Sequence, residues 1–121
     1  MRFLCLIYHS ADVNGTLTPV EIDKVIEEHF DYDAGLRQCG ALILSDALEA
    51  PEKAVVIRPR GTALSATDGP FAETKEHLAG FYLVEAADMS AATELARRIP
   101  SARYGAVEIR PIRILSLPDQ A

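Results

Sequence analysis

The stretch that decides the fold is Asp68-Gly69-Pro70-Phe71-Ala72-Glu73-Thr74-Lys75-Glu76, followed by His77-Leu78-Ala79-Gly80-Phe81-Tyr82-Leu83-Val84-Glu85. Its first three residues have turn chemistry, because aspartate can bond to its own backbone and proline presets one backbone angle. Residues 71–76 have room for one short helical turn. The run from Ala79 to Glu85 has the length and apolar composition of a strand. The stretch therefore predicts a turn that leads into a buried strand.

The chain before this stretch begins with a second strand pattern and continues into a helix. The apolar run from Phe3 to Tyr8 is typical of a central strand that is buried on both faces. Thr18-Pro19-Val20-Glu21 combines a capping box with proline at the first helical position. This helix should run to about Cys39, because Gly40 can adopt the left-handed conformation that ends helices. Ala41 to Ser45 has the composition of a further strand.

The remaining elements complete a recognisable order. Lys53 to Arg58 and Thr62 to Thr67 form a predicted hairpin. A second helix is capped by Asp88 or Ser90 and is stopped by Pro100. The last strand runs from Val107 to Pro111 and can continue to Leu115. Without the inserted hairpin the order is strand-helix-strand-strand-helix-strand. That order predicts an α+β fold, a ferredoxin-like split βαβ antiparallel sheet with both helices on one face. The other face needs a cover, and a second copy of the chain is the simplest one, so we expect a homodimer.

Composition and charge restrict the class of protein. The 121 residues suit a single domain over 1–121, with residues 116–121 as a loose tail. A net charge of −6 argues against non-specific binding to nucleic acid, which requires a basic surface. No apolar run is long enough to cross a membrane, and the one at the N-terminus is too short for a signal peptide. The two cysteines have no disulfide or metal-ligand pattern. We therefore expect a cytoplasmic protein.

The stretch 68–76 and its strand resemble the signature of YCII-related proteins of the DGPF-domain type. The resemblance extends to Leu6-Ile7-Tyr8, Leu36-Arg37-Gln38-Cys39-Gly40, residues 98–103 and residues 107–111. It implies the ferredoxin-like fold and its pairing into a dimeric α/β barrel. It also implies proton chemistry of the kind carried out by small isomerases and lyases. Members of this group often accompany extracytoplasmic-function sigma factors, which implies a possible protein partner.

The first helix carries the strongest catalytic candidates. On a helical wheel, His29 and Asp33 fall within the apolar stripe that Ile22, Val25, Ile26 and Leu36 define. A carboxylate that holds a neutral imidazole is a common way to orient a general base. A hydrogen-bonded pair without any function is the alternative. The resemblance implies a helical histidine at position 29, but the aspartate that would accompany it is missing from Ile99-Pro100-Ser101.

The quoted stretch supplies the second group of candidates. Asp68 is a candidate catalytic acid, although an aspartate before Gly-Pro can serve the turn alone. Residues that can shape a substrate pocket are Phe71, Glu73, Lys75, Tyr82 and His9. Lys75 can neutralise an anionic substrate or pair with a neighbouring glutamate. Tyr82 can offer its hydroxyl to a ligand or pack in the core, and His9 can lie at a pocket mouth.

Two hypotheses for function follow from these residues. The first is a small enzyme that needs no cofactor and no metal, and that uses His29 with Asp33 or Asp68 for acid–base chemistry on a small polar or anionic metabolite. The second is a non-catalytic ligand-binding or regulatory dimer. Five arginines lie in residues 97–113, and nine acids lie in residues 12–50. These complementary segments can meet within one chain or across a dimer, and the basic segment can also receive a carboxylate ligand or an acidic protein partner. A solvated surface without a partner is the alternative.

Overall fold

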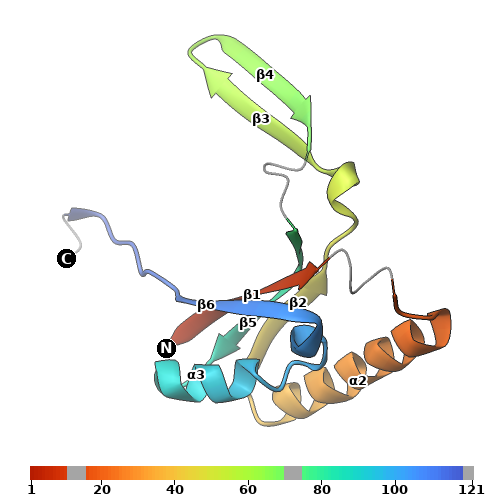
Figure 1. Ribbon diagram of the computed structural model, residues 1–121. Coiled ribbons are helices and arrows are strands. Elements are labelled where there is room, and N and C mark those ends of the chain that lie inside the picture. Colours follow the sequence, from red (N-terminus) through yellow and green to blue (C-terminus); the bar gives the residue numbers. More distant parts are fainter. Residues whose placement is uncertain (11–15, 70–74, 119–121) are drawn as a thin grey trace.

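The computed structural model describes residues 1–10, 16–69 and 75–118, and they form an α+β fold (Figure 1). Its elements in chain order are β1 (Arg2–Ser10), α2 (Pro19–Gln38), β2 (Leu42–Ala47), the 3₁₀ turn η1 (Pro51–Lys53), β3 (Val55–Arg60), β4 (Ala63–Asp68), β5 (Glu76–Glu85), α3 (Met89–Ala96), the 3₁₀ turn η2 (Pro100–Tyr104) and β6 (Gly105–Pro111). Strand β5 is the strand of the quoted stretch, and it begins three residues earlier than predicted.

The main sheet has four strands in the order β2-β5-β1-β6, and every neighbouring pair is antiparallel. Helix α2 connects β1 to β2 across β5, and α3 connects β5 to β6 across β1. Each half is thus a split βαβ unit, which is the ferredoxin-like arrangement. Both helices lie on the same face of the sheet (Figure 1).

Helix α2 begins where the capping box predicts. The Thr18 hydroxyl accepts a hydrogen bond from the Glu21 backbone N–H at 3.2 Å, and the Glu21 carboxylate accepts one from the Thr18 N–H at 3.1 Å. Together they satisfy two of the N–H groups that a helix start leaves unpaired. The helix ends before Gly40, whose φ of 81° is the left-handed conformation that favours glycine.

The core lies between the helices and one face of the sheet. It contains Phe3, Cys5, Ile7, Leu36, Leu42, Tyr82, Val84, Ala92, Ala96 and Ile99. Burial raises the pKa of the Cys5 thiol to about 11, so this cysteine is a neutral packing residue. The apolar stripe of α2 enters the core only in part, since Leu36 is buried whereas Ile22 and Ile26 are 41% and 48% exposed. Ile26 lines a cavity instead of packing among the buried side chains of the core.

The ends of α3 and β6 also differ from the prediction. Helix α3 stops at Ala96, and Pro100 begins η2 instead of directly ending the helix. Strand β6 stops at Pro111 and does not continue to Leu115. The physical reason is the ladder with β1. The Ile112 N–H donates a hydrogen bond to the carbonyl oxygen of Arg2, which is the first residue of β1, so residues after Ile112 have no further part of β1 to pair with. The predicted helical turn over residues 71–76 lies mostly outside the described residues.

Strands β3 and β4 pair antiparallel as a separate two-stranded sheet around Gly61, and this sheet projects away from the four-stranded one (Figure 1). Its register places Val55, Ile57 and Leu64 on one face, and all three are at least 60% exposed. The opposite face carries Arg58 and Ser65. A two-stranded sheet is marginal by itself in water, so this apolar face favours contact with another surface.

Candidate functional site

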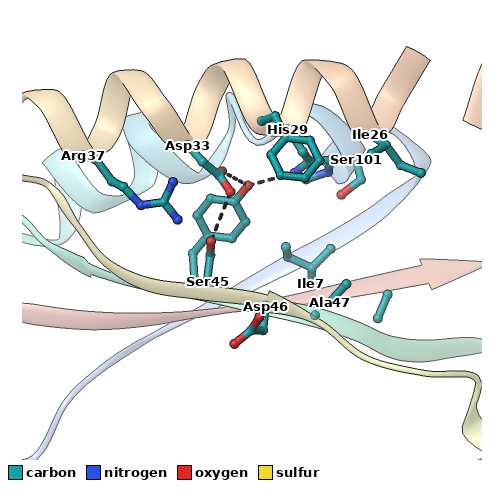
Figure 2. A pocket seen from close by; sticks show the side chains of 13 residues that line it. Ile7, Ile26, His29, Asp33, Arg37, Ser45, Asp46, Ala47 and Ser101 are labelled. Atoms are coloured by element: carbon teal, nitrogen blue, oxygen red, sulfur yellow. Dashed lines mark hydrogen bonds between the residues drawn. The ribbon is translucent and has the colours of Figure 1, made fainter. Parts of the chain in front are cut away.

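A cavity of about 400 Å³ lies between α2 and the helix-covered face of the sheet (Figure 2). It is lined by Ile7, Ile26, His29, Phe30, Asp33, Arg37, Ser45, Asp46, Ala47, Ala79, Gly80, Tyr82 and Ser101. A cavity of this size, with largely apolar walls and a few converging polar groups, is typical of a small-molecule site.

Helix α2 supplies the charged and titratable groups of the cavity. His29, Asp33 and Arg37 follow one another at four-residue intervals, so they lie on the same side of the helix. The sheet supplies the facing hydroxyls: Tyr82 from the central strand β5 and Ser45 from its neighbour β2, which are paired in the ladder.

These groups form one hydrogen-bonded network around the Tyr82 hydroxyl (Figure 2). Tyr82 Oη donates to Asp33 Oδ1, and Ser45 Oγ donates to Asp33 Oδ2 at 3.1 Å. His29 Nδ1 lies 2.8 Å from Tyr82 Oη. Both carboxylate oxygens of Asp33 are therefore satisfied, which offsets the cost of placing the carboxylate beside a packed core.

The direction of this network determines the tautomer of His29. The pKa of Tyr82 is raised, first by burial and then by its hydrogen bond to Asp33, so the phenol keeps its single proton. Since that proton is donated to Asp33, the hydroxyl oxygen must accept from His29 Nδ1. The proton of the neutral imidazole is then on Nδ1, and Nε2 has a free lone pair.

His29 has the protonation state of a base at neutral pH. Burial lowers the pKa of its imidazole, and the nearby charges of Asp33 and Glu28 oppose this effect while Arg103 adds to it. Among the described residues, His9 Nε2 is the only buried side-chain nitrogen or oxygen that lacks a hydrogen-bond partner. His29 lines the cavity, and its Nε2 makes no hydrogen bond with another described residue and is not among the buried unpartnered atoms, so it is accessible to solvent.

The Asp33→Asn variant tests this electrostatic arrangement. We expect the pKa of His29 to fall further, because the imidazolium loses a stabilising negative charge whereas asparagine keeps the shape of the network. An NMR titration of the histidine side chains measures the change. The pKa of His9, which is lowered first by burial and then by the charges of His77 and His29, has no contribution from Asp33, so Asp33→Asn should affect it only indirectly and by less than it affects His29. An unchanged or increased His29 pKa would contradict the network.

The structure brings three of the sequence-predicted site residues together. His29, Asp33 and Tyr82 share the cavity, but Tyr82 stands between the histidine and the aspartate instead of packing beside them. The expected direct pairing of His29 with Asp33 is therefore replaced by a bridged one. Tyr82 is 3% exposed, so it belongs both to the core and to the site.

The other predicted residues lie elsewhere. Asp68 is an exposed residue at the end of β4, and neither it nor the exposed Lys75 lines the cavity. The idea that Asp68 orients His29 finds no contact in the structure. His9 lies opposite His77 in the ladder of β1 and β5, beyond the residues that line the cavity. Phe71 and Glu73 lie outside the described residues.

Four polar residues that line the cavity were not predicted from the sequence: Arg37, Ser45, Asp46 and Ser101. Arg37 continues the four-residue spacing of His29 and Asp33, so the helical wheel contained a signal for it. Ser45 had no such signal, because only the pairing of β2 with β5 brings this serine below the helix.

The complementary charged segments meet within one chain at one point. Arg103 in η2 makes two hydrogen bonds to Glu28 of α2, at 2.9 and 3.2 Å. This contact lowers the pKa of the Glu28 carboxyl, chiefly through the hydrogen bond from Arg103. It attaches η2 to α2 beside the cavity, to which η2 contributes Ser101.

Residues 1–10, 16–69 and 75–118 contain no group of three or more histidine, cysteine or acidic side chains arranged to hold a metal ion. Within the same part of the chain, neither α-helix combines the length and apolar character that a membrane span requires.

Comparison with known proteins identifies one family and one curated relative that cover most of the chain. The YCII-related domain matches residues 1–116. An uncharacterized protein of Rhizobium meliloti (strain 1021) is 29% identical over 116 residues, which are 94% of each chain. The match covers β1, both helices and β6, and thus every element that surrounds the cavity. The chain is therefore a member of the YCII-related domain family.

Proposed function

We propose that this protein is a small acid–base enzyme of the isomerase or lyase type, and that His29 is its general base. One observation supports this above all: the Tyr82 hydroxyl donates to Asp33 and so leaves His29 Nε2 unprotonated at the cavity. A neutral imidazole with a lowered pKa is suited to accept a proton near neutral pH.

The proposed reaction begins when His29 Nε2 removes a proton from a carbon next to a carbonyl group. The C–H electron pair forms a carbon–carbon double bond to the carbonyl carbon, the π pair of the carbonyl group moves to its oxygen to give an enolate, and the imidazole becomes an imidazolium. Return of that proton to another carbon gives an isomer, whereas departure of a leaving group with its electron pair gives elimination. The Asp33 charge, linked through Tyr82, stabilises the imidazolium while it exists.

The cavity walls suit a small substrate. Ile7, Ile26 and Ala79 provide apolar surface beside His29, and apolar surroundings strengthen electrostatic interactions with a reacting group. The polar groups come from α2, from β2 and β5 of the sheet, and from Ser101 of η2. We infer that a small polar or anionic metabolite binds with its reacting carbon toward His29.

Proton exchange tests this function without knowledge of the natural substrate. We expect the native protein to catalyse exchange of C–H hydrogen for deuterium in D₂O on at least one member of a panel of short keto acids and enol lactones, followed by proton NMR. Exchange requires only the first step of the reaction. Ligand binding to the cavity without exchange on any compound would contradict the enzyme and support the alternative, a ligand-binding or regulatory module that works with a protein partner such as a sigma-factor system.

A homodimer is the second part of the proposal. The face of the sheet opposite the helices carries Leu4, Leu6, Leu44, Phe81 and Leu83, as the ladder registers of β1, β2 and β5 indicate. In Figure 1 neither helix covers this face. An apolar sheet face without a cover favours association, and pairing of two such faces would form the dimeric α/β barrel that the family resemblance implies.

Substitution of Leu44 tests the sheet face as the dimer interface. We expect Leu44→Lys to shift the molar mass measured by light scattering from a dimer toward a monomer, because a buried unpaired charge is costly. Ile22→Lys is the matched control: Ile22 and Leu44 are 41% and 48% exposed, but Ile22 lies on α2. A monomeric native protein, or dissociation by Ile22→Lys alone, would contradict this interface.

A further inference from the structure

We infer that Arg37 is an anion-binding residue of the cavity and that the ligand of this site carries a carboxylate group. The inference rests on the proposed function for the position of the reacting carbon, and it specifies the class of substrate. The residues involved are Arg37, the network around Asp33, and His29.

The first argument is the position of the guanidinium. Arg37 lies eight residues after His29 on α2, which is about 12 Å along the helix axis. Figure 2 shows its side chain directed back along the helix, toward Asp33 and Ser45. The guanidinium therefore lies at the opposite end of the hydrogen-bonded network from His29, and a short ligand can contact both groups.

The second argument is the hydrogen-bonding state of Arg37. Four other arginines of the described chain, Arg2, Arg97, Arg98 and Arg103, make ion pairs with glutamates. No hydrogen bond or ion pair is found between the Arg37 side chain and another described residue, although Asp33 lies one helical turn away on the same side. Both oxygens of Asp33 already accept hydroxyl protons from Tyr82 and Ser45. The donors of Arg37 thus remain available to a ligand.

The third argument is the balance of charge around the cavity. His29 is neutral, and the charge of Asp33 is engaged by two hydroxyls. Asp46 also lines the cavity. It is paired in the ladder with Phe81, which lies on the uncovered face of the sheet, and Figure 2 shows the Asp46 side chain below β2. Arg37 is therefore the positively charged group among the residues that line this cavity. A guanidinium matches a carboxylate with two parallel hydrogen bonds, which favours a carboxylate over a neutral polar group.

The resulting substrate class is a short carbonyl compound that ends in a carboxylate. The carboxylate binds Arg37, the chain of the ligand lies along the network, and the acidic C–H group lies at His29 Nε2. Arg37 acts as a binding residue, because it contacts the ligand away from the reacting carbon.

Binding of 4-oxopentanoate, compared with its neutral amide, tests the inference by NMR titration of backbone amide signals. We expect the native protein to bind the anion at least about tenfold more tightly than the amide, since hydrogen bonds to charged groups are the stronger ones. Arg37→Gln should weaken anion binding by about tenfold or more and leave amide binding unchanged, and Arg37→Lys should give an intermediate loss. Arg97→Gln, which removes a surface arginine paired with Glu94, should have no effect.

Equal binding of the anion by the native protein and Arg37→Gln would overturn the inference, as would no binding of the anion to the native protein. Binding does not require turnover, so the two proposals can fail separately. Anion binding that depends on Arg37, without deuterium exchange on any compound, would contradict the enzyme and support the anion site. Exchange that is insensitive to Arg37→Gln would support the enzyme and overturn the anion site.

Discussion

Replacement of His29 by glutamine should lower the rate of deuterium exchange by a factor of about 10² to 10⁴, the usual contribution of a general base. Glutamine cannot accept a proton at neutral pH, so the first step of the reaction loses its base. Its amide N–H₂ can still donate to the Tyr82 hydroxyl, whose partner in the native chain is His29 Nδ1 at 2.8 Å. We therefore expect the free energy of unfolding to change by less than about 1 kcal/mol.

Exchange kinetics and urea denaturation of the same samples measure the two quantities. His77→Gln is the control, because His77 lies on β5 outside the cavity and should leave exchange unchanged. The native exchange rate should fall as the pH decreases, since the active imidazole is the neutral form. Because burial lowers the His29 pKa, the midpoint should lie below the ordinary histidine value of about 6.5. A His29→Gln variant that exchanges at the native rate would eliminate His29 as the base.

Replacement of Gly105 by alanine should destabilise the protein by about 3 kcal/mol or more, at the upper end of the range for overpacking. A methyl group on Gly105 would overlap the backbone oxygen of Tyr8, and it would also approach the Cα atom of His9. Both are backbone atoms of the central strand β1, which pairs with β6 at this point. They cannot move aside without disturbing that ladder, so the overlap is costly.

Gly35→Ala is the matched control for this substitution. Gly35 lies within α2, and a Cβ atom there would meet no atom within 4 Å apart from its chain neighbours and the backbone of its own helix. Alanine has a higher helix propensity than glycine, so this variant should be more stable than the native protein by about 0.5–1 kcal/mol. Urea denaturation of the two variants should therefore show effects of opposite sign. A Gly105→Ala variant as stable as the native protein would contradict the close approach of β6 to β1.

Local chemistry made much of the fold predictable. The capping box at Thr18 and Glu21 and the left-handed position at Gly40 correctly predicted both ends of α2. The apolar runs around Phe3 and Val84 predicted the two central strands, because each run is a local signal of a buried strand. Each of these signals lies within a few consecutive residues, so it can be recognised without knowledge of the tertiary structure.

The candidate site was only half predictable. His29 and Asp33 stand out on a helical wheel because polar side chains within an apolar stripe need partners. Asp68 and Lys75 were chosen from the chemistry of a loop, but the structure places both away from the cavity. Their position depends on where β4 ends and β5 begins relative to α2, and nothing in the loop sequence itself contains that information.

The sequence by itself determined which segments become helix or strand, and it determined that one turn of α2 presents His29 and Asp33 on the same side. Only the tertiary structure decided that Tyr82 stands between them and that Ser45 completes the carboxylate. The physical reason is that helix periodicity brings together only residues a few positions apart in the sequence. Ser45 and Tyr82 are far from Asp33 in the sequence, and they reach it because β2 pairs with β5 and α2 packs on that pair of strands. The tautomer that leaves His29 Nε2 free follows from that packing.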